Sequence, residues 1–280
     1  MASIGIAAVA AHFGRDIPRA IPKVAGIISD ARRADISLLV FPDATLGGYI
    51  TNLRNPDLSV LPPSIALDGP ELAEVRELAG DMVICIGFTE RAEDGRLFNT
   101  AACLSAEAIW GLHRKVHRPL NESRVYAAGE HFGAFDTPLG RMGMLIDYDK
   151  TFPEAARALA DDGAQLIACL SAWPASTTDR AERLLQDRQS RLFDLYDGAR
   201  AAENQVVLVS SNQTGMSGDL RFLGQAKVVG PGGDVLSRTG PKGALAIADV
   251  DIEREVTRAR RVLHHLAERS PAAYRASTLI

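Results

Sequence analysis

The sequence predicts an α/β protein in which strands and helices alternate and pack in layers. Short runs rich in Val, Ile and Leu, which are typical of strands covered on both faces, recur along the chain. Longer segments with apolar residues at helical spacing lie between them. The chain has 280 residues and no internal repeat or low-complexity linker, so we expect one domain. Periodicity alone leaves open whether that domain holds one sheet or two.

The individual elements follow from these two patterns. Turn residues separate them, for example Gly230–Asp234, and Thr178 and Asp179 are placed to cap the long fourth helix. The expected strands are residues 4–11, 36–41, 82–88, 99–104, 142–146, 165–171, 206–211, 226–229 and 244–250. The expected helices are residues 19–33, 70–79, 153–162, 179–204 and 253–263.

Composition excludes several function classes. A net charge of −4 gives no electrostatic reason to expect nucleic acid or an anionic membrane as partner. No run approaches the roughly 18 apolar residues that a membrane helix needs. The apolar N-terminal run lacks the preceding basic residues of a signal peptide, so a cytoplasmic protein is expected.

The three cysteines lie in apolar, strand-like runs. Cys85, Cys103 and Cys169 are odd in number, and we expect them to be buried free thiols in a reducing compartment. No CxxC or Cys/His spacing indicates a metal site. The chain also lacks a dinucleotide fingerprint and a P-loop, so no cofactor is expected.

Four segments carry polar residues at expected strand ends or helix starts. In order, they are FPDATLGGY at 41–49, HRKVH at 113–117 with Glu122 following, GMLIDYDKTFPE at 143–154, and SAWP at 171–174. The first three resemble F-P-E-x-x-x-x-G-Y, Y-R-K-x-H and G-x-x-I-C-Y-D-x-x-F-P-E of the nitrilase, or carbon–nitrogen hydrolase, superfamily, and SAWP is similar to the segment of that superfamily that follows them. Residues 222–233 and the Arg269, Pro271 and Tyr274 set resemble its later segments, so the resemblance spans nearly the whole chain.

The resemblance implies a four-layer α-β-β-α sandwich as a single domain. That domain would cover residues 1–262, and residues 263–280 would form a C-terminal tail that packs on the domain or on a neighbouring subunit. The resemblance also implies a small-molecule substrate and a homodimer or larger assembly. Subunits of the superfamily usually pair through the helix after the nucleophile and the long helix expected at 179–204.

The resemblance further implies a site built around a cysteine nucleophile, a glutamate base, a lysine that supports the oxyanion, and a second glutamate. Lys115 matches the lysine and Glu122 matches the second glutamate. Asp43 matches the base and is one methylene shorter. Asp147 stands in the cysteine's place, either as a natural change or as an inactivation of the site.

Simpler roles are open for some of these residues. Asp43 could be a turn carboxylate that bonds local N–H groups, and Lys115 could be a solvated strand-end lysine. Trp173 could be a pocket wall or core. Tyr49, Tyr148 and His117 are expected to contact substrate or to support the catalytic groups, and His113 is expected to share a strand face with Lys115 and His117.

An Asp43–Lys115–Asp147 site predicts chemistry unlike that of a thiolate. A carboxylate is a weak nucleophile, but two neighbouring carboxyls differ in pKa and can act as an acid–base pair. We therefore expect a cofactor-free enzyme that cyclises, dehydrates or alters a C–N bond in a small amine, imine or amide. The open alternatives are an amidase or nitrilase inactivated at its cysteine, and a non-catalytic ligand-binding homologue.

Overall fold

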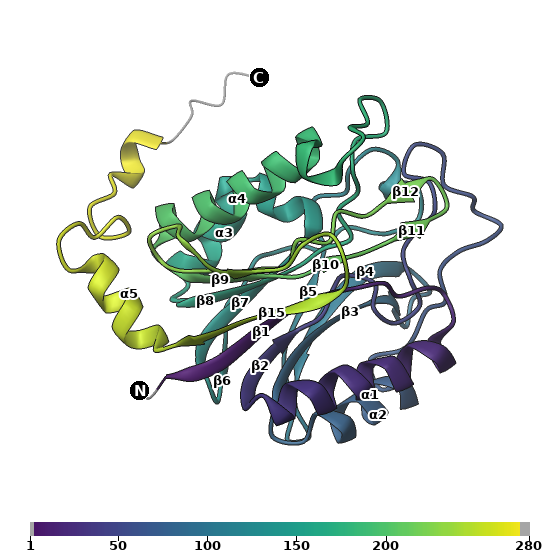
Figure 1. Cartoon of the computed structure of the whole chain (residues 1–280), viewed down its shortest axis with the longest axis horizontal. Helices are drawn as coiled ribbons and strands as arrows, with labels where there is room; N and C mark the ends of the chain where they lie inside the picture. Colours follow the sequence, from purple (N-terminus) through teal and green to yellow (C-terminus); the bar gives the residue numbers. More distant parts are fainter. Residues whose placement is uncertain (1–2, 275–280) are drawn as a thin grey trace.

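The computed structural model describes residues 3–274, and its two β-sheets pack face to face with helices on both outer faces (Figure 1). The first sheet has the order β10-β1-β2-β3-β4-β5, and β15 pairs with β1 on the same sheet. Its strands are β1 (Ile4–Ala11), β2 (Ile36–Val40), β3 (Val83–Arg91), β4 (Leu97–Leu104), β5 (Ile109–Arg114), β10 (Asn212–Gln213) and β15 (Ala244–Val250).

The second sheet has the order β14-β13-β9-β8-β7-β6, with β7, β8 and β9 parallel. A short hairpin, β11 (Met216–Ser217) and β12 (Leu220–Arg221), stands apart from both sheets. The strands of the second sheet are β6 (Phe135–Thr137), β7 (Gly140–Ile146), β8 (Leu166–Leu170), β9 (Val207–Ser210), β13 (Lys227–Val229) and β14 (Val235–Arg238).

Helices form the two outer layers. In Figure 1, α1 (Ile17–Arg33) and α2 (Pro70–Ala79) lie outside the first sheet, and α3 (Pro153–Asp161) and α4 (Arg188–Asn204) lie outside the second. Helix α5 (Ile252–Arg260) follows β15 at one end of the sandwich. The short 3₁₀ turns are η1 (Glu122–Arg124), η2 (Asp147–Thr151), η3 (Leu184–Gln186) and η4 (Pro271–Tyr274).

Three apolar cores separate the four layers. One lies between the sheets and includes Ile6 from β1 and Ile146 from β7. Another lies between the first sheet and its helices, with Val24 of α1, and a third joins the second sheet to α3 through Leu159. The parallel strands therefore bury both faces, which is why they read as continuous apolar runs. The expected four-layer α-β-β-α sandwich is confirmed. Within residues 3–274, no helix is long and apolar enough to cross a membrane.

One helix start was wrong. Helix α4 begins at Arg188, and Thr178 and Asp179 do not cap it. The cap is Asp187, whose carboxylate accepts the Gln189 N–H at 2.8 Å and the Ser176 N–H at 3.1 Å. By bonding backbone on both sides, this buried carboxylate folds residues 176–187 into a loop where a longer helix was expected.

The edge strand β5 was absent from the expected strands. Its side chains are only partly buried, so it lacks the continuous apolar run of the central strands. The register of β4 and β5 matters for the site, because β5 ends at Arg114, directly before Lys115.

The segment after α5 contacts the domain through Gln205. Its side-chain amide donates to the Leu263 carbonyl at 2.7 Å and accepts the His265 N–H at 3.0 Å. Leu266 packs beside the α3 core, and Arg269 pairs with Asp161. Residues 275–280 of the expected tail lie outside the described residues, and its packing on a neighbouring subunit stays a prediction.

Candidate active site

Asp147 lies where β7 ends and the η2 turn begins. Its φ of +50° is left-handed, a conformation that Asp tolerates better than most residues. The turn is held by Asp149, whose Oδ2 accepts the Ile146 N–H at 3.2 Å. Strand end and turn thus aim Asp147 outward at the carboxyl edge of a parallel sheet, where ligands of α/β proteins usually bind.

Lys115 meets Asp147 from the other sheet. Its N–H donates to the Asn99 carbonyl at 2.8 Å, which extends the pairing of β5 with β4 by one residue. Its ammonium lies 3.2 Å from Asp147 Oδ2 and 2.9 Å from Glu122 Oε2. The Tyr49 hydroxyl donates to Glu122 Oε1 at 2.7 Å. Lys115 is 1% exposed, so it is not a solvated surface lysine.

Asp43 follows β2 and is fully buried. Its Oδ2 accepts the side-chain amide of Asn99 at 3.0 Å, and its backbone is tied to Ser171 and Gln213. A Cβ placed on Gly87 of β3 would lie 2.8 Å from Asp43 Cα, so only glycine permits this approach. The simple turn role is therefore insufficient, because its carboxylate faces the same interior as Lys115 and Asp147.

Charge and burial set the protonation of this cluster. Burial raises the pKa of Asp43 to about 7; Lys115 opposes the rise, and Asp147 and Glu122 add to it. Burial likewise raises the pKa of Glu122, against the pull of Lys115. Burial alone would lower the pKa of Lys115, but Glu122, Asp147 and Asp43 outweigh it and raise that pKa. Lys115 is therefore a permanent cation at neutral pH, and Asp43 is part protonated.

Two carboxylate oxygens in the cluster have neither a hydrogen bond nor an ion pair with another described residue, whereas Glu122 Oε2 has its ion pair with Lys115. The two oxygens are Oδ1 of Asp43 and Oδ1 of Asp147, and both are buried. A buried acceptor without a partner costs roughly 1–3 kcal/mol, so the fold tolerates it where a ligand or a proton can complete the bond. The second carboxylate oxygen of each residue has a partner: Asp43 Oδ2 accepts from the Asn99 side chain, and Asp147 Oδ2 accepts from Lys115.

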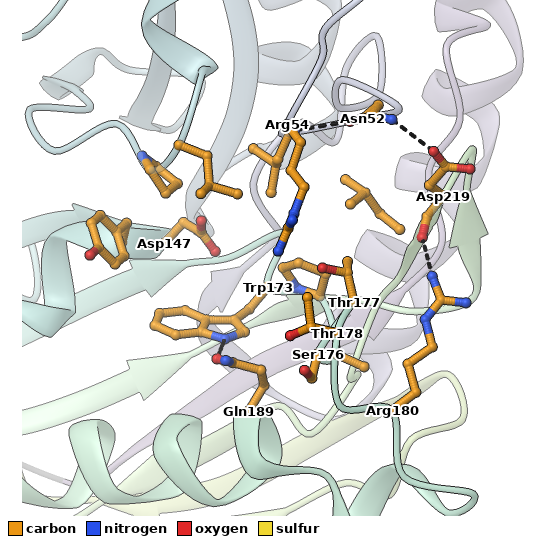
Figure 2. A pocket seen from close by; sticks show the side chains of 17 residues that line it. Asn52, Arg54, Asp147, Trp173, Ser176, Thr177, Thr178, Arg180, Gln189 and Asp219 are labelled. Atoms are coloured by element: carbon orange, nitrogen blue, oxygen red, sulfur yellow. Dashed lines mark hydrogen bonds between the residues drawn. The ribbon is translucent and has the colours of Figure 1, made fainter.

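A pocket of about 500 Å³ opens over Asp147 (Figure 2). Asp147 is 4% exposed and lines the pocket, whereas Asp43, Lys115 and Glu122 lie behind it. The remaining lining residues come from loops, the η2 turn, the start of α4 and the β11–β12 hairpin; they are Asn52, Leu53, Arg54, Pro119, Leu120, Tyr148, Trp173, Pro174, Ala175, Ser176, Thr177, Thr178, Arg180, Gln189, Asp219 and Leu220.

Trp173 and Tyr148 line the pocket together with Asp147. Figure 2 shows the Trp173 indole on the same side of the pocket as Asp147. The Trp173 indole N–H donates to Gln189 of α4 at 3.0 Å, and its backbone N–H donates to Asn212 at 2.8 Å. Trp173 is 7% exposed and also packs on Phe193, so it is both pocket wall and core.

The two histidines near Lys115 contact a different acid. His113 Nε2 and His117 Nδ1 each lie 2.9 Å from an oxygen of Asp149, and neither lines the pocket. Burial would raise the pKa of Asp149, but hydrogen bonds from both histidines outweigh it and lower the pKa to about 2. His117 also stacks on Phe152, with ring centroids 3.8 Å apart. The histidines therefore fix the turn that carries Asp147.

Sequence reasoning missed Asn99, Arg54 and Gln189. Asn99 sits inside an apolar strand, where a buried amide signals a partner, so it could have been suspected. Arg54 lies in a loop without periodicity. Gln189 lies in the first turn of α4, but the sequence placed the start of that helix at residue 179. No sequence signal therefore marked either residue.

No cysteine reaches this site. Cys85, Cys103 and Cys169 are free and buried within strands, as expected, and none lines the pocket. Burial raises the pKa of Cys169 to about 12, which leaves it a neutral thiol. Across residues 3–274, no group of three or more His, Cys, Asp or Glu side chains is arranged to hold a metal ion.

The double-sheet sandwich and its buried lysine–carboxylate cluster define the class of protein. The carbon-nitrogen hydrolase family model matches residues 4–261. The chain therefore belongs to the carbon–nitrogen hydrolase family, within the nitrilase superfamily.

Individual relatives agree with this assignment. The chain is 30% identical over 247 residues to the protein named hydrolase in pqqF 5′ region from Pseudomonas protegens, with 86% of this chain and 80% of that one covered. It is 28% identical over 228 residues to a probable nitrilase of Schizosaccharomyces pombe, covering 79% and 78%.

Solved structures share the fold. A carbon–nitrogen hydrolase from Helicobacter pylori superposes with a TM-score of 0.82 at 22% identity, over 97% of both chains. A Nesterenkonia amidase superposes with a TM-score of 0.77 at 20% identity, over 97% of this chain and 95% of that one. That structure is of a glutamate-to-glutamine mutant of the amidase, and it shows the acetamide moiety of fluoroacetamide covalently added at the active-site cysteine.

Proposed function

We propose that this protein is a cofactor-free acid–base enzyme that acts on a small nitrogen-containing metabolite. Asp147 would be the base that faces the substrate, Asp43 the acid partner, and Lys115 the cation that stabilises both. Ring closure or dehydration of an amine with a carbonyl is the reaction that suits these groups best. In this proposal Asp147 stands where relatives carry the cysteine nucleophile.

The observation that carries this proposal is the imbalance of charge around Lys115. One ammonium pairs with Glu122 and Asp147, and the third carboxyl, Asp43, forms no ion pair with another described residue. Its pKa of about 7 lets it hold or release a proton at neutral pH. A pocket without a reaction would bury three carboxyls at a cost of several kcal/mol for each unpaired charge.

The proposed reaction balances without an oxidant or reductant. The amine lone pair forms a C–N bond to the carbonyl carbon while Asp147 takes a nitrogen proton and Asp43 gives a proton to the oxygen. The hydroxyl then leaves as water with the proton from Asp147, and the remaining nitrogen proton returns to Asp43. Each carboxyl takes up one proton and gives up one, and no electrons leave the substrate.

The test begins with mass spectrometry of a metabolite panel of amines, imines and amides, in which a reaction appears as loss or gain of one water. On the substrate found, Asp147→Asn should lower kcat/KM by roughly 100-fold or more, the usual scale of general acid–base catalysis. Asp30→Asn, the same change at an exposed aspartate of α1 that does not line the pocket, serves as the matched control. Full activity of Asp147→Asn would contradict the proposal.

A second candidate is a hydrolase inactivated at its nucleophile. It is favoured by the Lys115–Glu122 pair, which stands beside position 147 as an oxyanion-supporting pair would. On this reading, Asp147→Cys combined with Asp43→Glu should restore measurable turnover of small amides or nitriles. A folded double variant without turnover across such a panel would set this candidate aside, and ligand binding without any reaction would favour a binding homologue.

A further inference from the structure

The rim of the pocket carries a cation that no other described residue engages. Arg54 is exposed, lines the pocket, and makes hydrogen bonds only through its backbone within residues 3–274. Figure 2 shows its side chain reaching into the pocket toward Trp173, with Asp147 to one side. A guanidinium that lies over a cavity and has no other partner can donate two parallel hydrogen bonds to a planar anion such as a carboxylate.

The other two charged residues at the rim each take part in a hydrogen bond. Arg180 donates to the Asp219 carbonyl at 3.1 Å, and the Asp219 carboxylate accepts the Asn52 amide at 2.8 Å. In Figure 2 these three residues gather at the rim on the side away from Asp147. Arg54 is therefore the rim cation whose guanidinium has no hydrogen bond to another described residue.

The floor of the pocket has the opposite sign. Asp147 faces the cavity, with Glu122 and Asp43 behind it, and among the described residues Lys115 is the cation that pairs with Asp147 and Glu122. With Asp43 protonated, the floor carries a formal charge of −1, and with Asp43 ionised it carries −2. Such a floor favours a nitrogen that donates hydrogen bonds or bears positive charge.

We infer that the pocket selects a small zwitterionic substrate, with its nitrogen group against Asp147 and a carboxylate on Arg54. This inference rests on the proposed function, because it names the substrate class of the same site. One guanidinium balances the single charge of a carboxylate, whereas a phosphate monoester carries about −1.5 to −2 and would need further cations. The exposed Thr177 and Thr178 side chains line the same pocket and can donate to a second carboxylate oxygen.

The test measures equilibrium binding, which requires no turnover. The probes are linear ω-amino acids from glycine to 6-aminohexanoate, the methyl ester of each, and the matching acids without the amine. Wild-type protein should bind the best-fitting amino acid about 10-fold or more tightly than its methyl ester, the usual worth of a charge-assisted hydrogen bond. Calorimetry or ligand-observed NMR reports the dissociation constants.

Variants assign the preference to residues. Arg54→Gln should reduce the acid-over-ester preference to about 2-fold or less, whereas Arg180→Gln, the matched control at the same rim, should keep it. Asp147→Asn should keep the acid-over-ester preference and lose the preference for the amine. Unchanged melting curves would show that each variant is folded.

Three outcomes overturn the inference: equal binding of acid and ester by the wild type, a preference that survives Arg54→Gln, or no binding by any member of the series. These results are separable from failure of the proposed function. If Asp147→Asn abolishes turnover while the acid-over-ester preference is absent, the substrate class is wrong and the acid–base role stands. If the preference follows Arg54 but Asp147→Asn keeps full turnover, the acid–base role is wrong and the anion contact stands.

Discussion

Two clusters of buried lysine and carboxylate lie in this fold, and they differ in charge balance. The site cluster consists of Asp43, Lys115, Glu122 and Asp147, with three carboxyls for one ammonium. The support cluster consists of the buried Lys150, Asp197 and Lys227 together with Asp194, which is partly exposed. Its two carboxylates pair with two ammoniums, and Arg238 lies 3.7 Å from Asp194 at the exposed edge.

The support cluster is fully paired. Asp197 lies 2.7 Å from Lys150 and 2.8 Å from Lys227, and the Phe193 ring centroid lies 3.1 Å from the Lys150 ammonium and 4.1 Å from the Lys227 ammonium. Burial lowers the pKa of Lys150, whereas the surrounding carboxyls raise that of Lys115. For Asp197, the two lysines outweigh burial and lower the pKa. The balanced charge of the support cluster is typical of a structural role, and the excess negative charge of the site cluster is typical of a site that binds a proton or a ligand.

The largest expected effect lies in the support cluster. Asp197→Asn would leave two buried ammoniums without their shared carboxylate, so the free energy of unfolding should fall by roughly 3–5 kcal/mol. Urea denaturation at pH 7 measures this. Asp147→Asn, the matched change in the site cluster, should cost less than about 1 kcal/mol. If both variants lost the same free energy of unfolding, the assignment of a structural role to one cluster and a ligand-binding role to the other would be wrong.

The second effect concerns pH. The pKa of Asp43 is raised from its usual 3.8 to about 7, so its contribution to stability is full below pH 4 and is lost as pH rises through 7. By pH 8 the loss should be on the order of 2–4 kcal/mol. Asp43→Asn should remove this slope between pH 4 and 8. A wild-type slope that persists in the variant would mean that another group titrates there, and exposed Asp30→Asn is the control.

A smaller effect is expected at Asp149, whose pKa is lowered to about 2. Its contribution is present above the unfolded value and is lost as pH falls through 2. Asp149→Asn should therefore lower the free energy of unfolding at pH 7 by about 2–3 kcal/mol, and the two proteins should converge near pH 2. Acid titration followed by circular dichroism tests this. A constant gap down to pH 2 would point to lost packing instead.

The smallest effect belongs to Arg54. Since its guanidinium has no partner within the described part of the chain, Arg54→Gln should change the free energy of unfolding by no more than about 0.5 kcal/mol. Thermal melts of the two proteins measure this. A larger destabilisation would mean that Arg54 supports the loop, and its role would then be structural.

The layers could be predicted because their cause is local in the sequence. Strands such as β8 are apolar on both faces, and α1 has apolar residues at helical spacing. The pattern of each element therefore indicates whether it is a strand or a helix. The start of α4 could not be predicted, because residues 179–187 have a helix-forming composition but a tertiary contact holds them in a loop. That contact is the bonding of Asp187 to Ser176, and no local pattern encodes it.

The candidate site divides in the same way. Asp43, Lys115 and Asp147 could be named because the segments that carry them resemble motifs of the superfamily. The strands that precede Asp43 and Asp147 were also expected from the sequence, whereas β5, which precedes Lys115, was not. The division of labour around them could not be foreseen, since it depends on which atoms meet across the two sheets. His117 forms a hydrogen bond with Asp149 and does not line the pocket. The side-chain amide of Asn99 donates to Asp43, and its backbone carbonyl accepts the Lys115 N–H.

The close approach of Gly87 to Asp43 bears on how such a pocket can be redesigned. Because the backbone at 43 is pressed against β3 and tied to Ser171 and Gln213, it cannot advance or retreat to suit a new substrate. Directed evolution at this position therefore has side-chain length as its adjustable variable, whereas the loops that carry Arg54 and Thr177 can change freely in sequence and in length. New specificities should accumulate in those loops first, over an interior that stays unchanged.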